Sequence, residues 1–370
     1  MRILADSNIS EVSEAFAGLG TVRTLPSHEI ARSALDGVDV LLSRSTIRVD
    51  DALLDGTPVR FYATATSGTD HVDLGALHRR GIGFASAHGS NATAVAQWFV
   101  AALDRAGFGL DWRGLRIGVV GVGAVGSRVA AAALALGASV SCCDPPRARA
   151  GHMPEGSPDW SLLDDVMGTC DVVTFHVPLT TTGPDATAQF IGSRQLDRLP
   201  SSAVFVNASR GEIVQSDALL ATGRRLLLDV FAGEPDFDRR LVAAAELATP
   251  HVAGHSVEGK LQGTKMIADA ATRFFRHTDA AWTPAPPVPA PLIVATPSEA
   301  VQLRCQLATS DAALRGISQL PTGERGRAFR SFRRGFIHRR EFAAGAVVHP
   351  DPNGTLQRLG FNVLAPSDAG

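Results

Sequence analysis

The sequence predicts an α/β protein with two parallel-sheet domains and a smaller mixed α/β unit near its C-terminal end. In two long regions, residues 2–86 and 115–254, short apolar runs alternate with amphipathic stretches, a pattern typical of βαβ units. A proline-rich stretch at 283–291, TPAPPVPAP, separates these regions from the rest of the chain. Each proline removes an amide donor and restricts the residue before it, so this stretch is expected to be a stiff linker.

The two regions contain eleven expected strands. Those of the first region are 2–6, 21–25, 39–43, 59–65 and 82–87. Those of the second region are 115–123, 139–144, 171–177, 203–209, 226–231 and 247–254. The stretches 91–106 and 256–275 have helical periodicity and no breaker, so two long helices are expected to bracket the second region.

A domain bracketed in this way resembles one inserted into another, with an active-site cleft between the two. We therefore expect a discontinuous first domain at 1–94 and 256–280 and an inserted second domain at 95–255. The linker then occupies 281–291, and a C-terminal domain occupies 292–370.

Composition narrows the class of protein. The chain has 370 residues, of which 45% are hydrophobic and 19% charged, and its formal net charge is -2. This composition is globular and gives no broad basic field for nucleic acid or anionic lipid. No apolar run reaches membrane-spanning length, and the N-terminal residues read as a strand. We expect a cytoplasmic protein, no nucleic-acid or membrane partner, and no metal site, because the spacings of the four cysteines match no zinc motif.

A glycine-rich turn follows the first strand of the second region. Gly121, Gly123 and Gly126 form GxGxxG, with Ala124 and Val125 between them, directly before a helix-like stretch. This arrangement suits a dinucleotide pyrophosphate, because the glycines allow close approach and the helix N-terminus supplies amides. Asp144 ends the next strand, where a carboxylate can bind the adenosine ribose and would repel a 2′-phosphate.

The sequence therefore predicts a Rossmann domain that binds NAD. Arg147, three residues after Asp144, leaves NADP as the open alternative, because it could contact a 2′-phosphate. The ordinary alternative for the whole motif is a tight turn and a strand end without a ligand.

Three chemically active residues follow three later strands. Arg210 lies in NASRGEIV, Glu234 in FAGEPD and His251 in PHVAGHS. All three are expected at the carboxyl edge of one parallel sheet, where ligands bind in such domains. His251 suits a general base, Glu234 can orient its ring and stabilise the imidazolium, and Arg210 offers paired donors to a carboxylate. This set predicts hydride transfer from a small 2-hydroxy acid, although each residue alone could be structural or solvent-exposed.

Several segments resemble the D-isomer-specific 2-hydroxyacid dehydrogenases. They are GVGAVGSRV, NASRGEIV, DVFAGEPD and PHVAGHSVEGK. More particular segments resemble the branch of this family that oxidises 4-phospho-D-erythronate to its 2-oxo acid in pyridoxal 5′-phosphate synthesis. They are LLSRST, YATATSGTDHVD, GSNATAV, CDPPRA, HSVEGKLQGT, FIHRREF and LGFNVL, so the likeness covers nearly the whole chain.

The resemblance implies two Rossmann/flavodoxin-like domains, of which the first binds substrate and the second binds NAD. It also implies that the C-terminal domain mediates a homodimer, a use that the basic stretch FRRGFIHRREF suits unless this stretch is a solvated face. Arg210, Glu234 and His251 take the catalytic positions. The implied cofactor contacts, besides the glycine turn, are Asp144, Thr174, Ala208, Ser209, Arg210, Asp229 and Gly254.

The resemblance also implies a set of substrate contacts. They are Ser45, Thr66, Ser67, Gly68 and His255, with Arg44 as a candidate phosphate ligand or a surface ion pair. His255 stands where the branch usually carries tyrosine, so the chemistry is unaffected but the substrate is less secure. The alternatives are another D-2-hydroxyacid dehydrogenase, such as a phosphoglycerate dehydrogenase, a non-catalytic NAD-sensing relative, and a degenerate relative without activity.

Overall fold

A computed structural model describes residues 1–153, 159–277, 282–336 and 339–368. The chain divides into two compact units, each described here by itself. Unit 1 comprises Met1–Asn91 and Val257–Pro287, and unit 2 comprises Ala92–Ser256 and Val288–Gly370. The end of the expected first domain (278–280), the first linker residue (281), and Ile337 and His338 of the basic stretch lie outside the described residues. No helix of the described part of the chain is long and apolar enough to cross a membrane.

Unit 1 contains a five-stranded parallel sheet in the order β2-β1-β3-β4-β5, the flavodoxin-like order expected for such a domain. The strands are β1 (Arg2–Asp6), β2 (Thr21–Leu25), β3 (Val40–Ser43), β4 (Phe61–Thr64) and β5 (Gly83–Ser86). The helical elements along this sheet are α1 (Val12–Phe16), η1 (Ser27–Glu29), η2 (Arg32–Leu35), α2 (Asp51–Leu54), α3 (Leu74–Arg79) and α11 (Val257–Phe274). The apolar side of α11 packs on β4 and β5, and its Ile267, Ala268 and Ala271 are buried with the strands.

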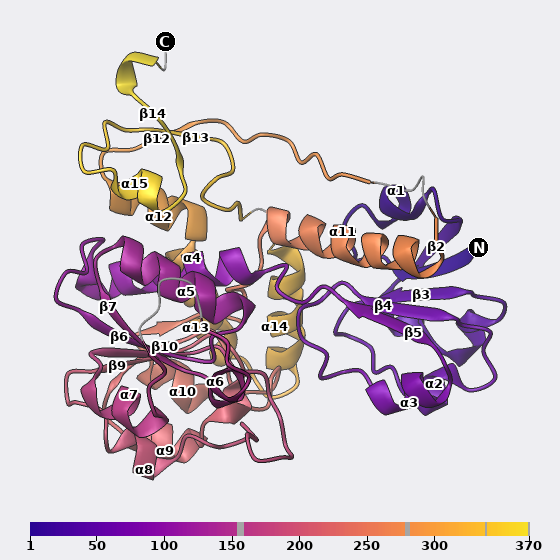
Figure 1. Cartoon of the computed structure of the whole chain (residues 1–370), viewed down its shortest axis with the longest axis horizontal. Helices are drawn as coiled ribbons and strands as arrows, with labels where there is room; N and C mark the ends of the chain where they lie inside the picture. The colour runs from indigo at the N-terminus through magenta and orange to yellow at the C-terminus, as the bar shows by residue number, and fades with distance from the viewer. Residues whose placement is uncertain (154–158, 278–281, 337–338, 369–370) are drawn as a thin grey trace. The chain divides into compact units, whose positions relative to one another are not determined.

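Unit 2 contains a six-stranded parallel sheet in the order β11-β10-β9-β8-β6-β7. The strands are β6 (Arg116–Val120), β7 (Ser139–Cys143), β8 (Val172–Phe175), β9 (Val204–Asn207), β10 (Arg225–Leu228) and β11 (Leu247–Ala248). These strands read as continuous apolar runs because helices bury both faces of the sheet. Figure 1 shows α4 (Ala92–Leu103) and α5 (Ala124–Ala135) on one face and α7 (Leu163–Thr169) and α10 (Arg239–Ala244) on the other. A strand overlaps each of the six expected runs, but the last is shorter than expected, because β11 covers only Leu247–Ala248 and residues 249–254 form a loop held by Asp229.

Shorter elements complete the layers of this sheet. They are η3 (Asp104–Phe108), a π-helical turn that extends α4, and α6 (Pro145–Arg149), α8 (Ser193–Leu196), η4 (Gly211–Ile213) and α9 (Ser216–Ala221). Trp160 also makes an isolated parallel bridge with Cys142 of β7, beyond the edge of the sheet.

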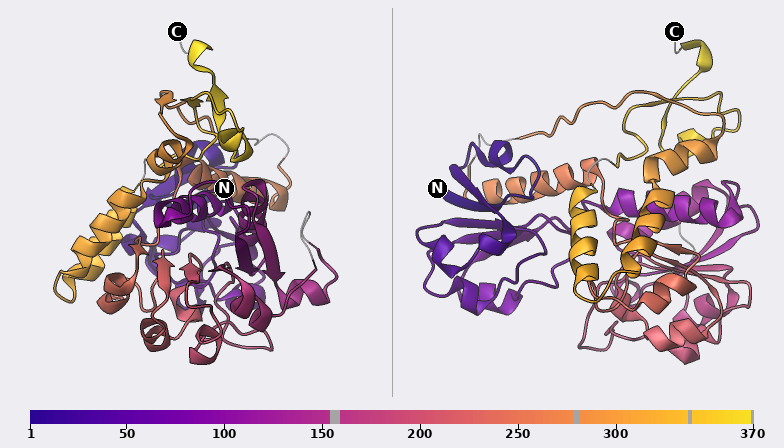
Figure 2. Two further views of the ribbon diagram at one scale, coloured as in Figure 1. Left: turned by 90° about the vertical axis from the view of Figure 1, so that its left-hand side faces the viewer. Right: turned by 180° about the vertical axis from the view of Figure 1, so that it is seen from behind.

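The residues after the linker belong to unit 2 and share its core. They form α12 (Pro297–Cys305), α13 (Leu307–Ser318), α14 (Glu324–Gly335), α15 (Thr355–Arg358) and η5 (Pro366–Asp368), with a small parallel sheet of β12 (Leu292–Ile293), β13 (Ala346–Val348) and β14 (Asn362–Leu364). Helix α12 packs on α4, and α13 packs on α4, α10, α14 and β11. Figure 2, right panel, shows this gold group of helices against the pink part of unit 2.

Candidate active site

The loop that follows β11, residues 249–255, carries the expected acid/base and is called the catalytic loop below. His251 lies at φ +55°, in the left-handed region that residues other than glycine rarely adopt. Its amide donates to the carbonyls of Asp229 at 2.7 Å and Thr249 at 2.9 Å. The backbone of the loop thus follows the end of the neighbouring strand β10, from which Asp229 projects.

His251 and Glu234 form a hydrogen-bonded pair. The Nδ1 atom of His251 lies 2.7 Å from Oε2 of Glu234, and the other carboxylate oxygen accepts the Phe231 amide at 2.8 Å. Burial opposes ionisation of Glu234, but the charge of His251 and its hydrogen bond outweigh burial, with a smaller contribution from the charge of Arg333, and the pKa of Glu234 is lowered. A side chain held in this way can fix the ring of the histidine and stabilise its protonated form.

The tautomer of His251 follows from this pairing. Because Nδ1 faces a carboxylate, it carries the proton, which leaves Nε2 as a proton acceptor. His251 is about one-third exposed (31%) and Glu234 half as much (16%), so the base is reachable while its partner is shielded.

The Asp229 side chain holds the backbone of the catalytic loop. Its side chain is buried, and its carboxylate accepts the amides of Val252 at 2.9 Å and Ala253 at 2.8 Å and the Thr249 hydroxyl at 2.5 Å. Burial raises the pKa of Asp229 to about 6, against the opposing effects of the His251 charge and these donors. The expected contact of Asp229 with the nicotinamide amide stays a prediction.

Arg210 follows β9, which pairs with β10 in the same sheet. The side-chain amide nitrogen of Asn207 donates to the Arg210 carbonyl at 2.8 Å, and an Arg210 terminal nitrogen donates to the Ser209 carbonyl at 2.8 Å. A Cβ on Gly211 would lie 2.0 Å from the carbonyl carbon of Phe231, so only glycine lets this loop touch the one that carries Glu234. Gly211 was not predicted from the sequence, although its place directly after Arg210 was a usable signal.

The glycine turn joins β6 to α5 as expected. Gly121 has φ +84°, and a Cβ on Gly126 would lie 2.0 Å from the Gly121 carbonyl oxygen, so both positions exclude other residues. A Cβ on Gly123 would meet no atom within 4 Å, so packing does not require glycine there. Gly123 precedes α5 without any side-chain cap, which leaves the first amides of α5, those of Ala124 and Val125 included, to a ligand.

Asp144 stands beside this turn at the end of β7. Its carboxylate accepts the amide of Val122 at 2.8 Å and that of Arg147 at 3.1 Å. The Arg147 Nε atom is buried and has no hydrogen-bond partner among the described residues. The turn, the uncapped helix and the carboxylate at the second strand fit a bound NAD, with Asp144 at the adenosine ribose.

His176 lies next to the glycine turn and was not predicted from the sequence as a site residue. Its Nε2 atom lies 3.0 Å from the hydroxyl of Thr174, an expected cofactor contact. Burial lowers the pKa of His176 to about 3, so the ring is neutral, and its Nδ1 atom has no partner within the described part of the chain. Its position just past the end of β8 was the available signal. A neutral ring with an unsatisfied buried nitrogen beside the glycine turn also suits a polar cofactor.

The expected substrate contacts of unit 1 follow two neighbouring strands. Arg44 and Ser45 follow β3, and residues 66–68, comprising Thr66, Ser67 and Gly68, follow β4. The Thr66 hydroxyl lies 2.7 Å from that of Thr64 and donates to the Gly68 carbonyl at 2.9 Å. Ser67 accepts the Gly89 amide at 3.1 Å.

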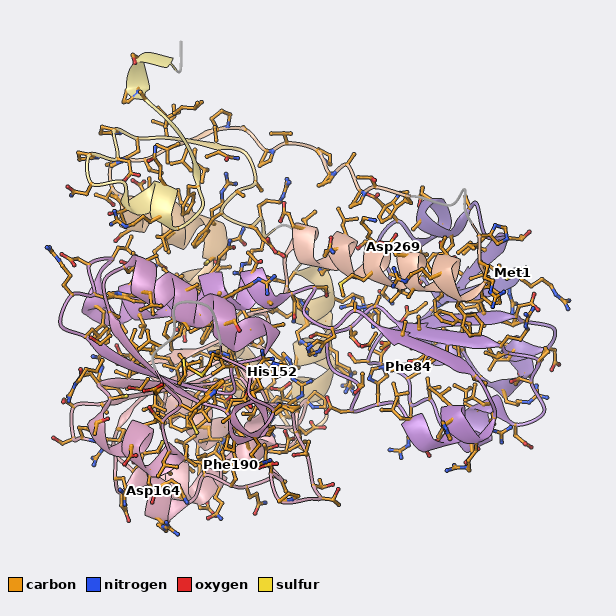
Figure 3. All side chains as sticks on the ribbon, in the orientation of Figure 1. Met1, Phe84, His152, Asp164, Phe190 and Asp269 are labelled. Atoms are coloured by element: carbon orange, nitrogen blue, oxygen red, sulfur yellow. The ribbon has the colours of Figure 1, made fainter. Side chains whose placement is uncertain are left out.

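Buried side chains support these loops from below. The hydroxyl of Tyr62 lies 2.8 Å from that of Ser43, and the Tyr62 ring stacks on Phe84, which Figure 3 labels. The remaining expected contacts, Gly254 and His255, lie in the catalytic loop of unit 2, where the His255 amide donates to the Val252 carbonyl at 2.8 Å. The placement of these residues in one cleft with those of unit 1 stays a prediction.

Two arginines of the basic stretch reach the catalytic loop. Arg333 of α14 donates from Nε to the His251 carbonyl at 3.1 Å. Arg339 is buried and donates to the Ala253 carbonyl at 2.7 Å. This stretch was expected to be a dimer contact or a solvated face. The side chain of Arg339 is buried, so it can serve as neither. A basic stretch with phenylalanines at helical spacing was a signal that part of it is buried.

Comparisons with known proteins place this geometry among enzymes. The family described as "D-isomer specific 2-hydroxyacid dehydrogenase, NAD binding domain" matches residues 86–253. The erythronate-4-phosphate dehydrogenase of Salinibacter ruber is 42% identical over 370 residues, which cover 94% of each chain. That of Salmonella arizonae is 38% identical over 98% of this chain and 99% of its own.

Solved structures show a similar fold over about three quarters of the chain. The TT0316 protein of Thermus thermophilus matches 74% of this chain and 96% of its own, with a TM-score of 0.61 and 25% identity. An NAD-bound 3-phosphoglycerate dehydrogenase of Entamoeba histolytica matches 75% and 96%, with a TM-score of 0.63 and 20% identity.

Proposed function

The chain belongs to the erythronate-4-phosphate dehydrogenases, within the D-isomer-specific 2-hydroxyacid dehydrogenases, and we propose that it oxidises 4-phospho-D-erythronate to (R)-3-hydroxy-2-oxo-4-phosphooxybutanoate with NAD. The product is an intermediate on the route to pyridoxal 5′-phosphate. The observation that carries the proposal is the 2.7 Å hydrogen bond between His251 and Glu234 at the edge of the NAD-binding sheet. It provides a reachable base with a shielded, ionised partner.

The chemistry follows from these residues. His251 accepts the proton of the substrate C2 hydroxyl at Nε2, while Glu234 stabilises the imidazolium that forms. Arg210 supplies a planar cation for the substrate carboxylate or for the C2 oxygen as it becomes a carbonyl. NAD, when bound, accepts the hydride from C2. In the reverse direction the protonated His251 returns its proton to the C2 oxygen.

Recognition of the phosphate distinguishes this substrate from simpler hydroxy acids. Arg44 is the candidate cation for the phosphate. Ser67 and Gly68 offer loop amides to the substrate carboxylate, and Ser45 and Thr66 are further candidate substrate contacts at the ends of neighbouring strands. His255 takes the position of the usual tyrosine and can still donate a hydrogen bond.

The assembly and the location of the protein are part of the same proposal. A homodimer is supported by exposed apolar side chains in the C-terminal part of unit 2, where Ile293 is 80% and Leu303 49% exposed. A cytoplasmic location is supported by the four cysteines, all among the described residues, which are buried and form no disulfide, as is usual in a reducing compartment.

The test is a comparison of substrates under one set of conditions. NADH formation is measured with 4-phospho-D-erythronate, D-erythronate, 3-phospho-D-glycerate and D-lactate. The highest kcat/KM is expected with 4-phospho-D-erythronate. A higher value with 3-phosphoglycerate would assign the chain to a different activity of the same chemistry, and no turnover with any of them would contradict catalysis itself.

A further inference from the structure

The catalytic loop is held from two sides. On one side, Asp229 accepts the amides of Val252 and Ala253 through its carboxylate and that of His251 through its carbonyl. On the other side, Arg333 and Arg339 donate to the carbonyls of His251, Val252 and Ala253. Both arginines belong to the residues after the linker, called the C-terminal segment below. Three successive residues, His251, Val252 and Ala253, therefore have both their main-chain N–H and their C=O groups engaged.

Arg333 reaches the loop from α14. Its Nε atom donates to the His251 carbonyl at 3.1 Å, and its guanidinium lies 5.7 Å from the ring centre of buried Phe329. Burial lowers the pKa of Arg333, and the Arg210 charge acts in the same direction. The carboxylates of Glu234 and Asp229 oppose this effect. Arg333 thus lies within electrostatic reach of the residues that surround the base.

Arg339 connects the loop to helix α4. One terminal nitrogen donates to the carbonyls of Ala253 at 2.7 Å and Val252 at 3.4 Å, and the other donates to the Ala94 carbonyl of α4 at 2.6 Å. The side chain is 1% exposed. A buried guanidinium is costly unless its donors are satisfied, and here main-chain carbonyls accept from both terminal nitrogens, whereas the buried Nε has no partner among the described residues. The Ser256 hydroxyl, directly after the loop, donates to the Glu341 carboxylate at 2.8 Å. Glu341 lies two residues after Arg339, so this part of the chain also holds the residue that follows the loop.

The backbone of His251 makes such support necessary. A left-handed conformation at a residue other than glycine is costly and persists only where surrounding contacts impose it. Without donors on its carbonyls, the loop can relax while Asp229 still holds its amides. A shift of about 1 Å at the base can cost on the order of 100-fold in rate, because proton and hydride transfer require close alignment.

We propose that Arg333 and Arg339 are positioning residues for hydride transfer, and that the C-terminal segment is therefore part of the catalytic apparatus in addition to any role in assembly. The matched family region ends at residue 253, so both arginines lie outside it. The proposal rests on the proposed function only in the choice of substrate for the turnover assay.

The first experiment compares Arg333→Gln with Arg334→Gln in the full-length protein. Arg334 is the next residue of α14 and is exposed, so it is a matched control for loss of one positive charge. For Arg333→Gln we expect kcat to fall on the order of 10- to 100-fold with the KM for NAD nearly unchanged. The kinetic isotope effect with C2-deuterated substrate should rise, because misalignment slows hydride transfer itself. Arg333→Lys, which keeps a charged donor, should recover part of the loss.

A loss of fold would give a different result. It would lower the amount of active protein without changing the isotope effect, and lysine would rescue no better than glutamine. An unchanged kcat in Arg333→Gln, or an equal loss in Arg334→Gln, would overturn the proposal.

The second experiment does not depend on turnover. Hydrogen exchange followed by mass spectrometry should show faster exchange in peptides covering 249–255 for Arg333→Gln and Arg339→Gln, with unit 1 unchanged. Arg339→Gln is the more disruptive of the two, so Arg333→Gln decides the result. Unchanged exchange in the loop of Arg333→Gln would contradict the proposal. If the unmodified protein fails to oxidise 4-phospho-D-erythronate, the proposed function fails while the exchange measurement still tests this inference.

Discussion

The amide of His251 donates to the carbonyl of Asp229 at 2.7 Å, and the Asp229 carboxylate accepts the next two amides of the loop. One residue at the end of β10 therefore holds the amides of the backbone that carries the proposed base. Glu234, six residues after the end of the same strand, holds the imidazole itself at 2.7 Å. The amide side of the loop and the side chain of His251 are thus held from one strand end, while Arg333 and Arg339 hold its carbonyls.

Replacing the base tests its role directly. His251→Asn removes the proton acceptor but keeps a polar side chain of similar size, so kcat should fall on the order of 100-fold or more. The Kd for NADH, measured by fluorescence, should remain close to that of the unmodified protein. His28→Asn, at a side chain that is 81% exposed, is the control and should be fully active. A loss of less than about 10-fold would remove His251 from its proposed role.

The hydrogen bond between His251 and Glu234 predicts a loss of turnover when the carboxylate is removed. Glu234→Gln removes a negative charge that stabilises the imidazolium and the acceptor that orients the ring, so kcat should fall. Glu14→Gln, on the exposed side of α1, should keep full activity. An unchanged kcat in Glu234→Gln would show that the pair does not act together.

The lowered pKa of the Glu234 carboxylate predicts how the stability of the fold changes with pH. The pKa of Glu234 is lowered in the folded state from an ordinary value of 4.5, so its ionisation stabilises the fold above that value. This contribution is lost as pH falls through the folded pKa. The difference in Tm between the unmodified protein and Glu234→Gln should accordingly be larger at pH 7 than at pH 3.

Cofactor preference should depend on Asp144. Its carboxylate lies beside the glycine turn and would repel the extra phosphate of NADP, so kcat/KM should favour NAD. Asp144→Ser should reduce this preference on the order of 10-fold or more, because a charge is removed while the hydroxyl can still bind ribose. Arg147→Ala should make the Asp144→Ser protein less able to use NADP. A preference for NADP in the unmodified protein would contradict the assignment.

The positions of the three expected catalytic residues were predictable because each lies in the loop after a strand. Arg210, Glu234 and His251 follow β9, β10 and β11, and parallel strands bring their carboxyl ends to one edge. Their catalytic roles stay predictions. Gly121 and Gly126 were predictable for a similar reason, since their spacing has a steric meaning within a strand, turn and helix, whereas packing does not require glycine at position 123.

The supporting contacts were not predictable because they join residues far apart in sequence. Arg333 and Arg339 contact a loop about 80 residues earlier, and their surroundings read locally as a charged helix. The burial of Asp229 and the positive φ of His251 are likewise consequences of tertiary packing. Periodicity identifies elements, but it does not say which distant carbonyl a buried arginine will meet.

The dimer proposal needs surface substitutions to test it, because truncation at the linker would remove part of a core. Val301, Leu307, Phe342 and other residues after the linker are buried with α4 and α5, so a chain cut near residue 291 should lose the fold of unit 2. The double variant Ile293→Asp and Leu303→Asp should instead sediment as a folded monomer, because a charge on each exposed apolar side chain is costly in an interface. Leu162→Asp, at a residue 72% exposed elsewhere in unit 2, is the control and should remain dimeric. A dimer that survives the double variant would place the interface elsewhere.

Substrate choice should depend mainly on the phosphate. A site built for this group leaves its donors and cations unpaired when the group is absent, which costs on the order of 100-fold or more in kcat/KM. The protein should therefore prefer 4-phospho-D-erythronate to D-erythronate by at least that factor, and His255→Tyr should keep or increase the preference, since tyrosine also donates a hydrogen bond. Arg44→Ala should reduce the preference if Arg44 binds the phosphate, whereas Arg48→Ala, at an exposed side chain five residues beyond β3, should not change it. Equal kcat/KM values for the two acids would leave the dehydrogenase chemistry intact, because His251, Glu234 and Arg210 act on C2 and its carboxylate, but they would contradict phosphate recognition and with it the proposed substrate.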